Sequence, residues 1–185
     1  MKVQETKLKD CFIIHDTVFA DSRGYFFESF NQQRFASLIG LNVSFVQDNQ
    51  SKSTKGVLRG LHFQQGDSAQ AKLVRVLKGT VLDVAVDLRE DSATFGQWEA
   101  VELSEENHLQ FFVPRGFGHG FVVLSEEAVF FYKCDNFYNK AAEGGIVYND
   151  TSLNIDWKLP ESELLLSDKD KILPTFEAIK NNLKF

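Results

Sequence analysis

Leu73-Val-Arg-Val-Leu-Lys-Gly79-Thr-Val-Leu-Asp-Val-Ala-Val-Asp-Leu88 is the stretch of the sequence that decides the fold. It is rich in β-branched and apolar residues, which favours two short strands. Lys78-Gly79 between the two indicates a hairpin, because glycine readily adopts the positive φ that a tight turn requires. In the second half, a face of apolar side chains alternates with a mixed face that carries Asp83, which is typical of a strand with one buried side.

Segments of the same kind recur at close intervals along the chain. The sequence predicts nine strands, at Cys11–Phe19, Ser44–Gln47, Val57–Phe63, Leu73–Leu77, Thr80–Leu88, Gln97–Leu103, Gln110–Val113, Gly120–Leu124 and Ala128–Cys134. It predicts helices only at Asn31–Ile39 and Thr175–Leu183. Because there is no repeat and no linker, we expect a single domain over residues 1–185: an all-β jelly-roll sandwich or barrel with small peripheral helices.

Composition limits the classes of function. The 185 residues suffice for one domain with a sizeable core, and the net charge of -6 argues against non-specific nucleic-acid binding. Cys11 and Cys134 lie far apart in the sequence and are expected to be free thiols in a reducing compartment. No apolar run approaches the ~20 residues of a membrane span, so we expect no membrane association and a cytoplasmic location.

The most informative candidate site residues lie in Gly56-Val-Leu-Arg-Gly-Leu-His-Phe-Gln64 and just after it. Arg59 and Lys72 are suited to an anionic ligand, and His62 is suited to proton transfer near neutral pH. A lone histidine between apolar neighbours is also compatible with a purely structural, half-buried role. Ser167-Asp-Lys-Asp170 offers two carboxylates that could orient the imidazole, and the spacing leaves open which of them does so.

Two further polar segments allow a structural and a functional interpretation. Arg23 and Glu28 follow a turn, and they belong either to a solvated edge strand or to a ligand site. Gln47-Asp-Asn-Gln-Ser51 either caps a turn by hydrogen bonds from side chain to backbone or lines a pocket. Amide side chains both donate and accept hydrogen bonds, so such a pocket would suit a sugar or the edge of a base.

Histidine and tyrosine complete the set of candidates. His119 lies between two glycines that allow a close approach of backbone or ligand. The His-x-His pair of a jelly-roll metal site is missing around His62, because residue 60 is Gly and residue 64 is Gln; we therefore expect no metal. Tyr132 and Tyr138 fit the core and its rim, or alternatively a general acid and a surface on which a base stacks.

Eight segments together resemble one family. The chain is similar to the dTDP-4-dehydrorhamnose 3,5-epimerases in order from about residue 11 to residue 176. It departs from their usual pattern at Gly118, where Ala is usual, at Tyr148, where Trp is common, and at Thr151, where Pro is usual. The similarity rests on the segments that begin at Asp21, Phe45, Gly56, Gln70, Asp83, Pro114, Tyr132 and Leu166.

The resemblance implies a cupin-like enzyme without metal or other cofactor. It would convert dTDP-4-dehydro-6-deoxy-D-glucose into dTDP-4-dehydro-L-rhamnose, by family analogy for a bacterial surface polysaccharide. In this family His62 would be the base, oriented by Asp170, and Tyr132 would be the acid across the sugar ring. Lys72 would stabilise the enolate oxygen that forms at C4.

The resemblance also implies a nucleotide site and a homodimer. In the family, the segment with Arg23 and Glu28 reaches into the site of a partner subunit. Alternatives remain within and outside this activity: epimerisation at C3 or C5 alone, a 3,4-ketoisomerase, or a sugar-nucleotide-binding protein without catalysis. The expected substrate contacts are Arg23, Glu28, Gln47, Asp48, Asn49, Arg59, His119, Tyr138, Glu143 and Lys169.

Overall fold

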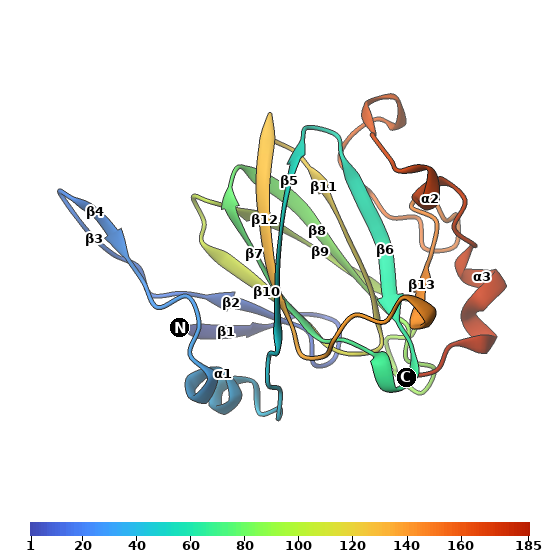
Figure 1. Cartoon of the computed structure of the whole chain (residues 1–185), viewed down its shortest axis with the longest axis horizontal. Helices are drawn as coiled ribbons and strands as arrows, with labels where there is room; N and C mark the ends of the chain where they lie inside the picture. The colour runs from blue at the N-terminus through green and yellow to red at the C-terminus, as the bar shows by residue number, and fades with distance from the viewer.

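The computed structural model describes residues 1–185 as a sandwich of two antiparallel sheets (Figure 1). This confirms the predicted all-β jelly roll. The first sheet has the strand order β1 (Lys2–Glu5), β2 (Phe12–His15), β10 (Leu109–Val113), β7 (Lys72–Lys78), β12 (Glu127–Cys134) and β5 (Gln47–Thr54). The second has the order β13 (Glu143–Gly145), β6 (Leu58–Gln64), β11 (Phe117–Val123), β8 (Thr80–Asp87) and β9 (Trp98–Ser104).

The helices are short and peripheral, as the sequence predicts. The helix expected at Asn31–Ile39 is confirmed as α1 (Gln32–Ile39): the Asn31 side chain accepts a hydrogen bond from the backbone N–H of Arg34 at 3.0 Å, and Gly40 ends the helix at a φ of 69°. The helix expected at Thr175–Leu183 is shorter. It consists of α3 (Phe176–Ile179) and a 3-10 turn at Lys180–Asn182. None of the helices has the length and apolar character needed to span a membrane.

The hairpin predicted at Lys78-Gly79 is wrong. β7 and β8 belong to different sheets, and Gly79 alone carries the chain from one sheet to the other. A hairpin needs at least two loop residues, so a one-residue connection leaves the strands unable to pair. Gly79 has a φ of 77°, and a Cβ atom there would lie 2.0 Å from the carbonyl oxygen of Glu127. Glycine is therefore required at this crossing for both conformation and space.

The strand predicted at Ser44–Gln47 is also misplaced. The structure begins β5 at Gln47 and continues it to Thr54, through the run of polar residues that the sequence leaves as a turn or a pocket. The side chains alternate along it: those from Gln47 to Ser53 at odd positions are half-buried or buried, and those between are exposed. Both faces are polar because one meets solvent and the other a cavity, so no hydrophobic periodicity marks this strand.

Most other differences are matters of strand ends. β11 begins at Phe117 rather than at Gly120, which places His119 inside the strand. The strand expected at Cys11–Phe19 is interrupted after His15. The strands β1 and β13 are not predicted, because each has only three or four residues and little apolar pattern.

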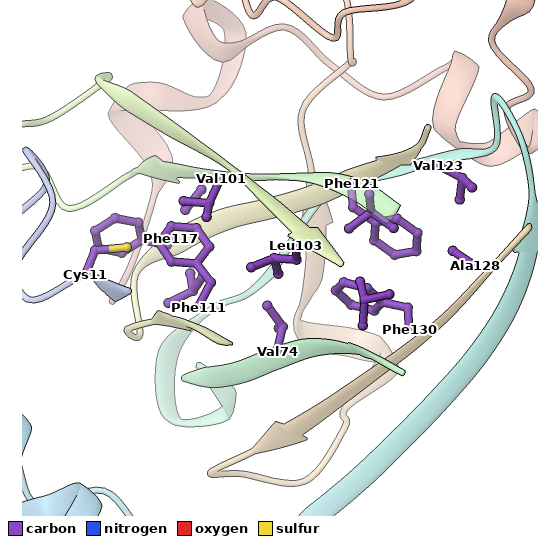
Figure 2. Close-up of a cluster of buried hydrophobic side chains, with 14 of the residues drawn as sticks. Cys11, Val74, Val101, Leu103, Phe111, Phe117, Phe121, Val123, Ala128 and Phe130 are labelled. Carbon is purple, nitrogen blue, oxygen red and sulfur yellow. The ribbon is translucent and has the colours of Figure 1, made fainter. Parts of the chain in front are cut away.

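The main hydrophobic core lies between the two sheets. Figure 2 shows it extending from Cys11, Phe111 and Phe117 at one end to Phe121 and Phe130 at the other. Cys11 and Cys134 are both buried free thiols. A second core packs the outer face of the five-stranded sheet against the C-terminal segment, and a third packs α1 against one end of the six-stranded sheet. The sandwich is thereby covered on parts of both outer faces.

An arm of two short strands projects from the body (Figure 1). β3 (Phe19–Asp21) and β4 (Gly24–Phe26) pair only with each other, and every residue in them is exposed. At the base of the arm, His108 contacts the rings of Tyr25 and Phe27, with ring centroids 4.8 and 5.1 Å apart. The arm thus presents Phe19, Tyr25 and Phe26 to solvent, which is unusual for large apolar side chains in an isolated chain.

Two glycines bring β6 and β11 unusually close together. A Cβ atom on Gly60 would lie 2.6 Å from the Cα of Gly120, and one on Gly120 would lie 2.7 Å from the carbonyl oxygen of Arg59. The pairing register is irregular here: His119 lies opposite His62, and Phe121 lies opposite Arg59. A β-bulge of this kind redirects side chains, and here it aims both histidines into the space between the sheets.

We predict that Gly60→Ala lowers the free energy of unfolding by at least about 2 kcal/mol, because a Cβ at a φ of 117° would collide with backbone. Gly118→Ala on the same strand pair is the control. Its Cβ would meet side chains only, the nearest being the Cδ1 of Leu88 at 3.3 Å, so the change stays within about 1 kcal/mol. Urea denaturation measures both; equal effects of the two substitutions would contradict this account of the close approach.

Candidate active site

A cavity of about 600 Å³ opens between the two sheets, on the side where β5 forms the edge of one sheet and residues 165–170 border β6 of the other. A smaller hollow of about 180 Å³ adjoins it. The two share four polar side chains: Asn49, His62, Lys72 and Tyr132. The residues that the sequence singles out as catalytic, from segments far apart in the chain, therefore meet in one place.

His62 and Asp170 form a short, directed pair. The Nε2 of His62 lies 2.6 Å from the Oδ1 of Asp170, which is buried, whereas Asp168 is exposed and pairs with Lys171. Of the two aspartates, therefore, only Asp170 contacts the imidazole. Because a carboxylate only accepts, Nε2 carries the hydrogen in this pair, and in the neutral form of the imidazole the lone pair is left on Nδ1.

Asp170 is held by the C-terminal segment of the chain. It lies in α2 (Asp168–Lys171), where the hydroxyl of Ser167 accepts its backbone N–H at 3.1 Å. The segment before α2 is tied to the start of β6 by backbone hydrogen bonds between Leu165 and both Gly56 and Leu58. Burial alone would raise the pKa of Asp170, but hydrogen bonds from His62 and Ser167 outweigh it and lower the pKa, so the carboxylate stays charged.

A second chain of polar groups lies deeper in the cavity. The Nε2 of His119 donates to the buried carboxylate of Asp83, at 2.9 and 3.1 Å from its two oxygens. The ammonium of Lys72 then donates to the Nδ1 of His119 at 3.4 Å. Burial lowers the pKa of His119 and raises the pKa of Asp83. The neutral imidazole therefore links a carboxylate to a lysine whose remaining hydrogens are free to meet a ligand.

The charge of Lys72 is set by its surroundings. Burial lowers the pKa of its ammonium, although the nearby charges of Asp83 and Glu143 act in the opposite direction. Its Nζ also lies 6.0 Å from the ring centre of Tyr132. A cation with few water neighbours interacts strongly with negative charge that develops close to it.

Tyr132 faces the cavity from the sheet opposite to His62. It lies on β12, opposite Asn49 of β5, and its hydroxyl makes no hydrogen bond with another protein group. Burial raises the pKa of the phenol, which therefore stays protonated well above neutral pH. A protonated, uncommitted phenol is a proton donor for whatever occupies the space between the sheets.

The rim of the cavity is closed on one side by three linked side chains. The carboxylate of Glu143 accepts from the hydroxyl of Tyr138 at 2.9 Å and from the ammonium of Lys169 at 2.6 Å. Burial would raise the pKa of Glu143, but these two partners outweigh it and lower the pKa. The exposed ring of Tyr138 remains available as a flat surface at the entrance.

Further predicted contacts lie at the entrance of the cavity. On β6, the guanidinium of Arg59 donates to the hydroxyl of Ser53 at 3.2 Å and is otherwise free of an anionic partner. On β5, the amide of Gln47 donates to the side-chain oxygen of Asn49 at 3.1 Å. The side of the entrance formed by β6 is therefore cationic, and the side formed by β5 carries amides.

Three of the expected substrate contacts lie outside this cavity. Asp48 is on the solvent face of β5, where it pairs with Lys133 at 2.9 Å, so its expected substrate contact is not met in the cavity. Arg23 is at the tip of the arm and pairs with Asp21. Glu28 lies beyond the arm and pairs with Arg34 of α1. The strand alternation explains Asp48, because neighbours on a strand point to opposite faces.

Asp83 and Ser53 belong to the site although the sequence did not single them out as functional. Asp83 stands in an apolar strand, and an acid at such a position is the signal that could have identified it, because a buried carboxylate needs a partner. Ser53 carries no such signal. The structure contains no group of three His, Cys, Asp or Glu side chains arranged to hold a metal ion.

The fold and the cavity define the class of protein first: a cupin-like jelly roll with a polar, enzyme-type cavity inside the sandwich. Comparisons then give the family. The family model for dTDP-4-dehydrorhamnose 3,5-epimerase matches residues 5–178. The chain is 54% identical over 180 residues to the dTDP-4-dehydrorhamnose 3,5-epimerase of Salmonella typhimurium, covering 96% of each protein.

Solved structures agree with the sequence comparison. The crystal structure of dTDP-4-dehydrorhamnose 3,5-epimerase from Elizabethkingia anophelis is 63% identical, with a TM-score of 0.94, covering 96% of this chain and 97% of that one. An epimerase from Legionella pneumophila in complex with dTDP-4-keto-L-rhamnose is 47% identical, with a TM-score of 0.94, covering 99% and 97%. The chain belongs to the dTDP-4-dehydrorhamnose 3,5-epimerase family, and it is an enzyme.

We predict that Lys72 titrates below 10.5, the ordinary value for lysine, because burial disfavours its ammonium form. Lys78 is the internal control, since its hydrogen bond to Glu127 raises its pKa. NMR of the lysine side-chain carbons against pH measures both, and Asp83→Asn should lower the pKa of Lys72 further by removing an attracting charge. A Lys72 signal that titrates together with or above Lys78 would contradict the electrostatics described for the cavity.

Proposed function

We propose that this chain epimerises C3 and C5 of dTDP-4-dehydro-6-deoxy-D-glucose by acid–base chemistry between His62 and Tyr132. The observation that carries the proposal is the pair His62–Asp170, which is held at 2.6 Å on one side of the cavity with Tyr132 on the other side. A hexose ring that lies between the two sheets has one residue on each of its faces. Inversion of a carbon requires removal of a proton from one face and delivery to the other.

The chemistry begins at a carbon next to the C4 ketone. The Nδ1 of His62 takes the proton from C5 or C3, and the electron pair moves onto the C4 oxygen as an enolate. Asp170 holds the ring and stabilises the imidazolium that forms. Tyr132 then delivers its phenolic proton to the opposite face of the same carbon, the ketone is restored, and both residues recover their protonation states by exchange with solvent.

Lys72 stabilises the enolate oxygen. Its ammonium lies deep in the cavity, where His119 and Asp83 hold it, and the free hydrogens lie where the C4 oxygen of a bound ring would reach. Fixed positive charge in a dry site lowers the energy of a developing oxyanion more than the same charge does in water. His119 acts here as a neutral link that fixes the position of Lys72.

The nucleotide extends outward from the entrance of the cavity. The diphosphate meets Arg59 and Lys169, the only cations at this entrance, which are suited to phosphate oxygens. Asn49 and Gln47 supply amide groups beside them. Tyr138 offers its exposed ring to the thymine, since a base gains contact area by stacking on an aromatic side chain.

The arm completes the site across a homodimer. Arg23 and Glu28 lie outside the cavity of their own chain, and the arm that carries Arg23 exposes three aromatic side chains. In an isologous dimer each arm lies against the other subunit, which buries these rings and brings Arg23 to the partner's diphosphate site. This arrangement accounts for an apolar arm on an otherwise acidic chain.

The proposal is tested by incubating the 4-keto substrate with the protein in D2O and following C3 and C5 by NMR. We expect deuterium at both carbons and the L-rhamno product. Exchange at neither carbon would remove the epimerase proposal, and exchange at one carbon alone would favour a mono-epimerase.

Substitutions separate the roles of the two residues. His62→Ala should slow exchange at both carbons by about 10²- to 10⁴-fold, because no base remains. Tyr132→Phe should still incorporate deuterium from the His62 side, but it should form little inverted product, because the acid on the opposite face is missing. A Tyr132→Phe enzyme that forms product at the normal rate would contradict the role of Tyr132, and circular dichroism checks that both variants are folded.

A subunit-mixing experiment tests the arm. Arg23→Ala and His62→Ala are each expected to be poorly active as homodimers. Refolding the two together forms heterodimers in which one site combines an intact His62 with an intact Arg23 from the other chain. We therefore expect the mixture to recover activity that neither variant has; a mixture no more active than its components would show that the arm does not act across the dimer.

A further inference from the structure

The ring of Tyr138 stands on a part of the chain without regular structure. Residues 135–139 connect the end of β12 to the 3-10 turn at Lys140–Ala142 and belong to no helix or strand. We call these five residues the entrance segment. Tyr138 has 54% of its surface exposed, so packing holds its side chain only in part. Because irregular, exposed segments are mobile unless other groups tie them down, the position of this ring depends on contacts made to the entrance segment.

One side chain binds the backbone on both sides of Tyr138. Gln64 is the last residue of β6, and its Oε1 accepts a hydrogen bond from the backbone N–H of Asn139 at 2.6 Å. The Nε2 of the same amide donates to the carbonyl oxygen of Phe137 at 3.4 Å and to that of Ser68 at 3.0 Å. The residues immediately before and after Tyr138 are therefore fixed to β6 through a single amide group.

Gln64 is buried and is directed by its partners. It has only 6% of its surface exposed, and it lines the smaller hollow together with His62, which lies two residues earlier on the same face of β6. A buried amide that has lost its water must find donors and acceptors in the protein, and this one has two acceptors for its N–H groups and one donor for its oxygen. Exchanging the oxygen and the nitrogen would place like groups together, so the amide has one favourable orientation.

Other contacts to the entrance segment are fewer at Tyr138 itself. The Nε2 of Gln70 donates to the carbonyl oxygen of Asn136 at 2.7 Å, which holds the start of the segment. The backbone N–H of Tyr138 donates to the Oε1 of Gln47 at 3.3 Å. Without Gln64, the segment would remain attached at its start and by this one longer bond, and the ring would gain freedom of movement.

We propose that Gln64 is a positioning residue for the nucleotide: it holds the ring of Tyr138 where the base stacks on it. This inference rests on the proposed function, which assigns the thymine to Tyr138. A ring that is already fixed loses little entropy when a ligand binds, whereas a mobile segment must be ordered at a cost in affinity. Gln64 therefore acts on the affinity for the nucleotide and not on proton transfer.

The first test measures the affinity for dTDP by calorimetry. Gln64→Met keeps the length of the side chain but removes the amide, and we expect it to weaken dTDP binding by about three- to tenfold. In a Tyr138→Ala background the same substitution should change the affinity by less than about 1.5-fold, because the ring that Gln64 positions is gone. Unchanged dTDP affinity in Gln64→Met, or equal weakening in both backgrounds, would overturn the inference.

Gln65→Met is the matched control. Gln65 is the next residue in the chain, but its Oε1 accepts from the backbone N–H of Lys184 at 3.1 Å and it lines neither hollow. This variant should bind dTDP as the native protein does, and a loss as large as that in Gln64→Met would overturn the inference. Amide hydrogen exchange checks the local effects: the amide of Asn139 should exchange faster in Gln64→Met, and the amide of Lys184 in Gln65→Met. Gln64→Asn, whose amide is too short to reach the same partners, replaces the methionine variant if that variant does not fold.

Kinetics with the 4-keto substrate separate binding from chemistry. Gln64→Met should raise KM by about the factor that it costs dTDP and leave kcat within about twofold, since Gln64 makes no hydrogen bond to His62, Lys72 or Tyr132. A fall in kcat with KM unchanged would overturn the inference. The dTDP measurements need no turnover, so a native protein that fails the D2O exchange experiment while Gln64 and Tyr138 remain coupled in dTDP binding would count against the proposed function only.

Discussion

The close approach of β6 and β11 at Gly60 and Gly120 is the constraint on which the rest of the site depends. Because neither residue has a side chain, two backbones touch where sheet strands would ordinarily be kept apart. The irregular register that results places His62 and His119 opposite each other and turns both toward the space between the sheets. The glycines therefore act on the chemistry through the backbone, without touching any ligand.

A polar cavity inside a sandwich is energetically unfavourable unless its polar groups satisfy one another. In this protein a buried acid, a neutral imidazole and a lysine form one connected chain from Asp83 through His119 to Lys72. Each member reduces the desolvation penalty of the next, and the chain ends on a cation that faces the open space. Stability and reactivity are thus linked, because the partners that permit burial also keep the charge in place.

Much of this architecture could be predicted from the sequence, and the failures have physical causes. Apolar alternation identified most strands, and His62 stood out because few residue types transfer protons near neutral pH. The strand β5 escapes prediction because a segment between solvent and a polar cavity has no apolar face. Lys78-Gly79 predicts a hairpin because the local sequence shows a turn but not which sheet receives the next strand. Asp48 is predicted to contact substrate because the face on which it lies depends on a register that the sequence does not state.

The partners His62 and Asp170 are separated by 108 positions along the chain. The histidine belongs to the five-stranded sheet, whereas the carboxylate belongs to the C-terminal segment that packs on the outer face of that sheet. The carboxylate therefore contacts the histidine only while this segment is packed in place. Local opening of the segment would separate the base from its partner even if the sandwich itself stayed folded.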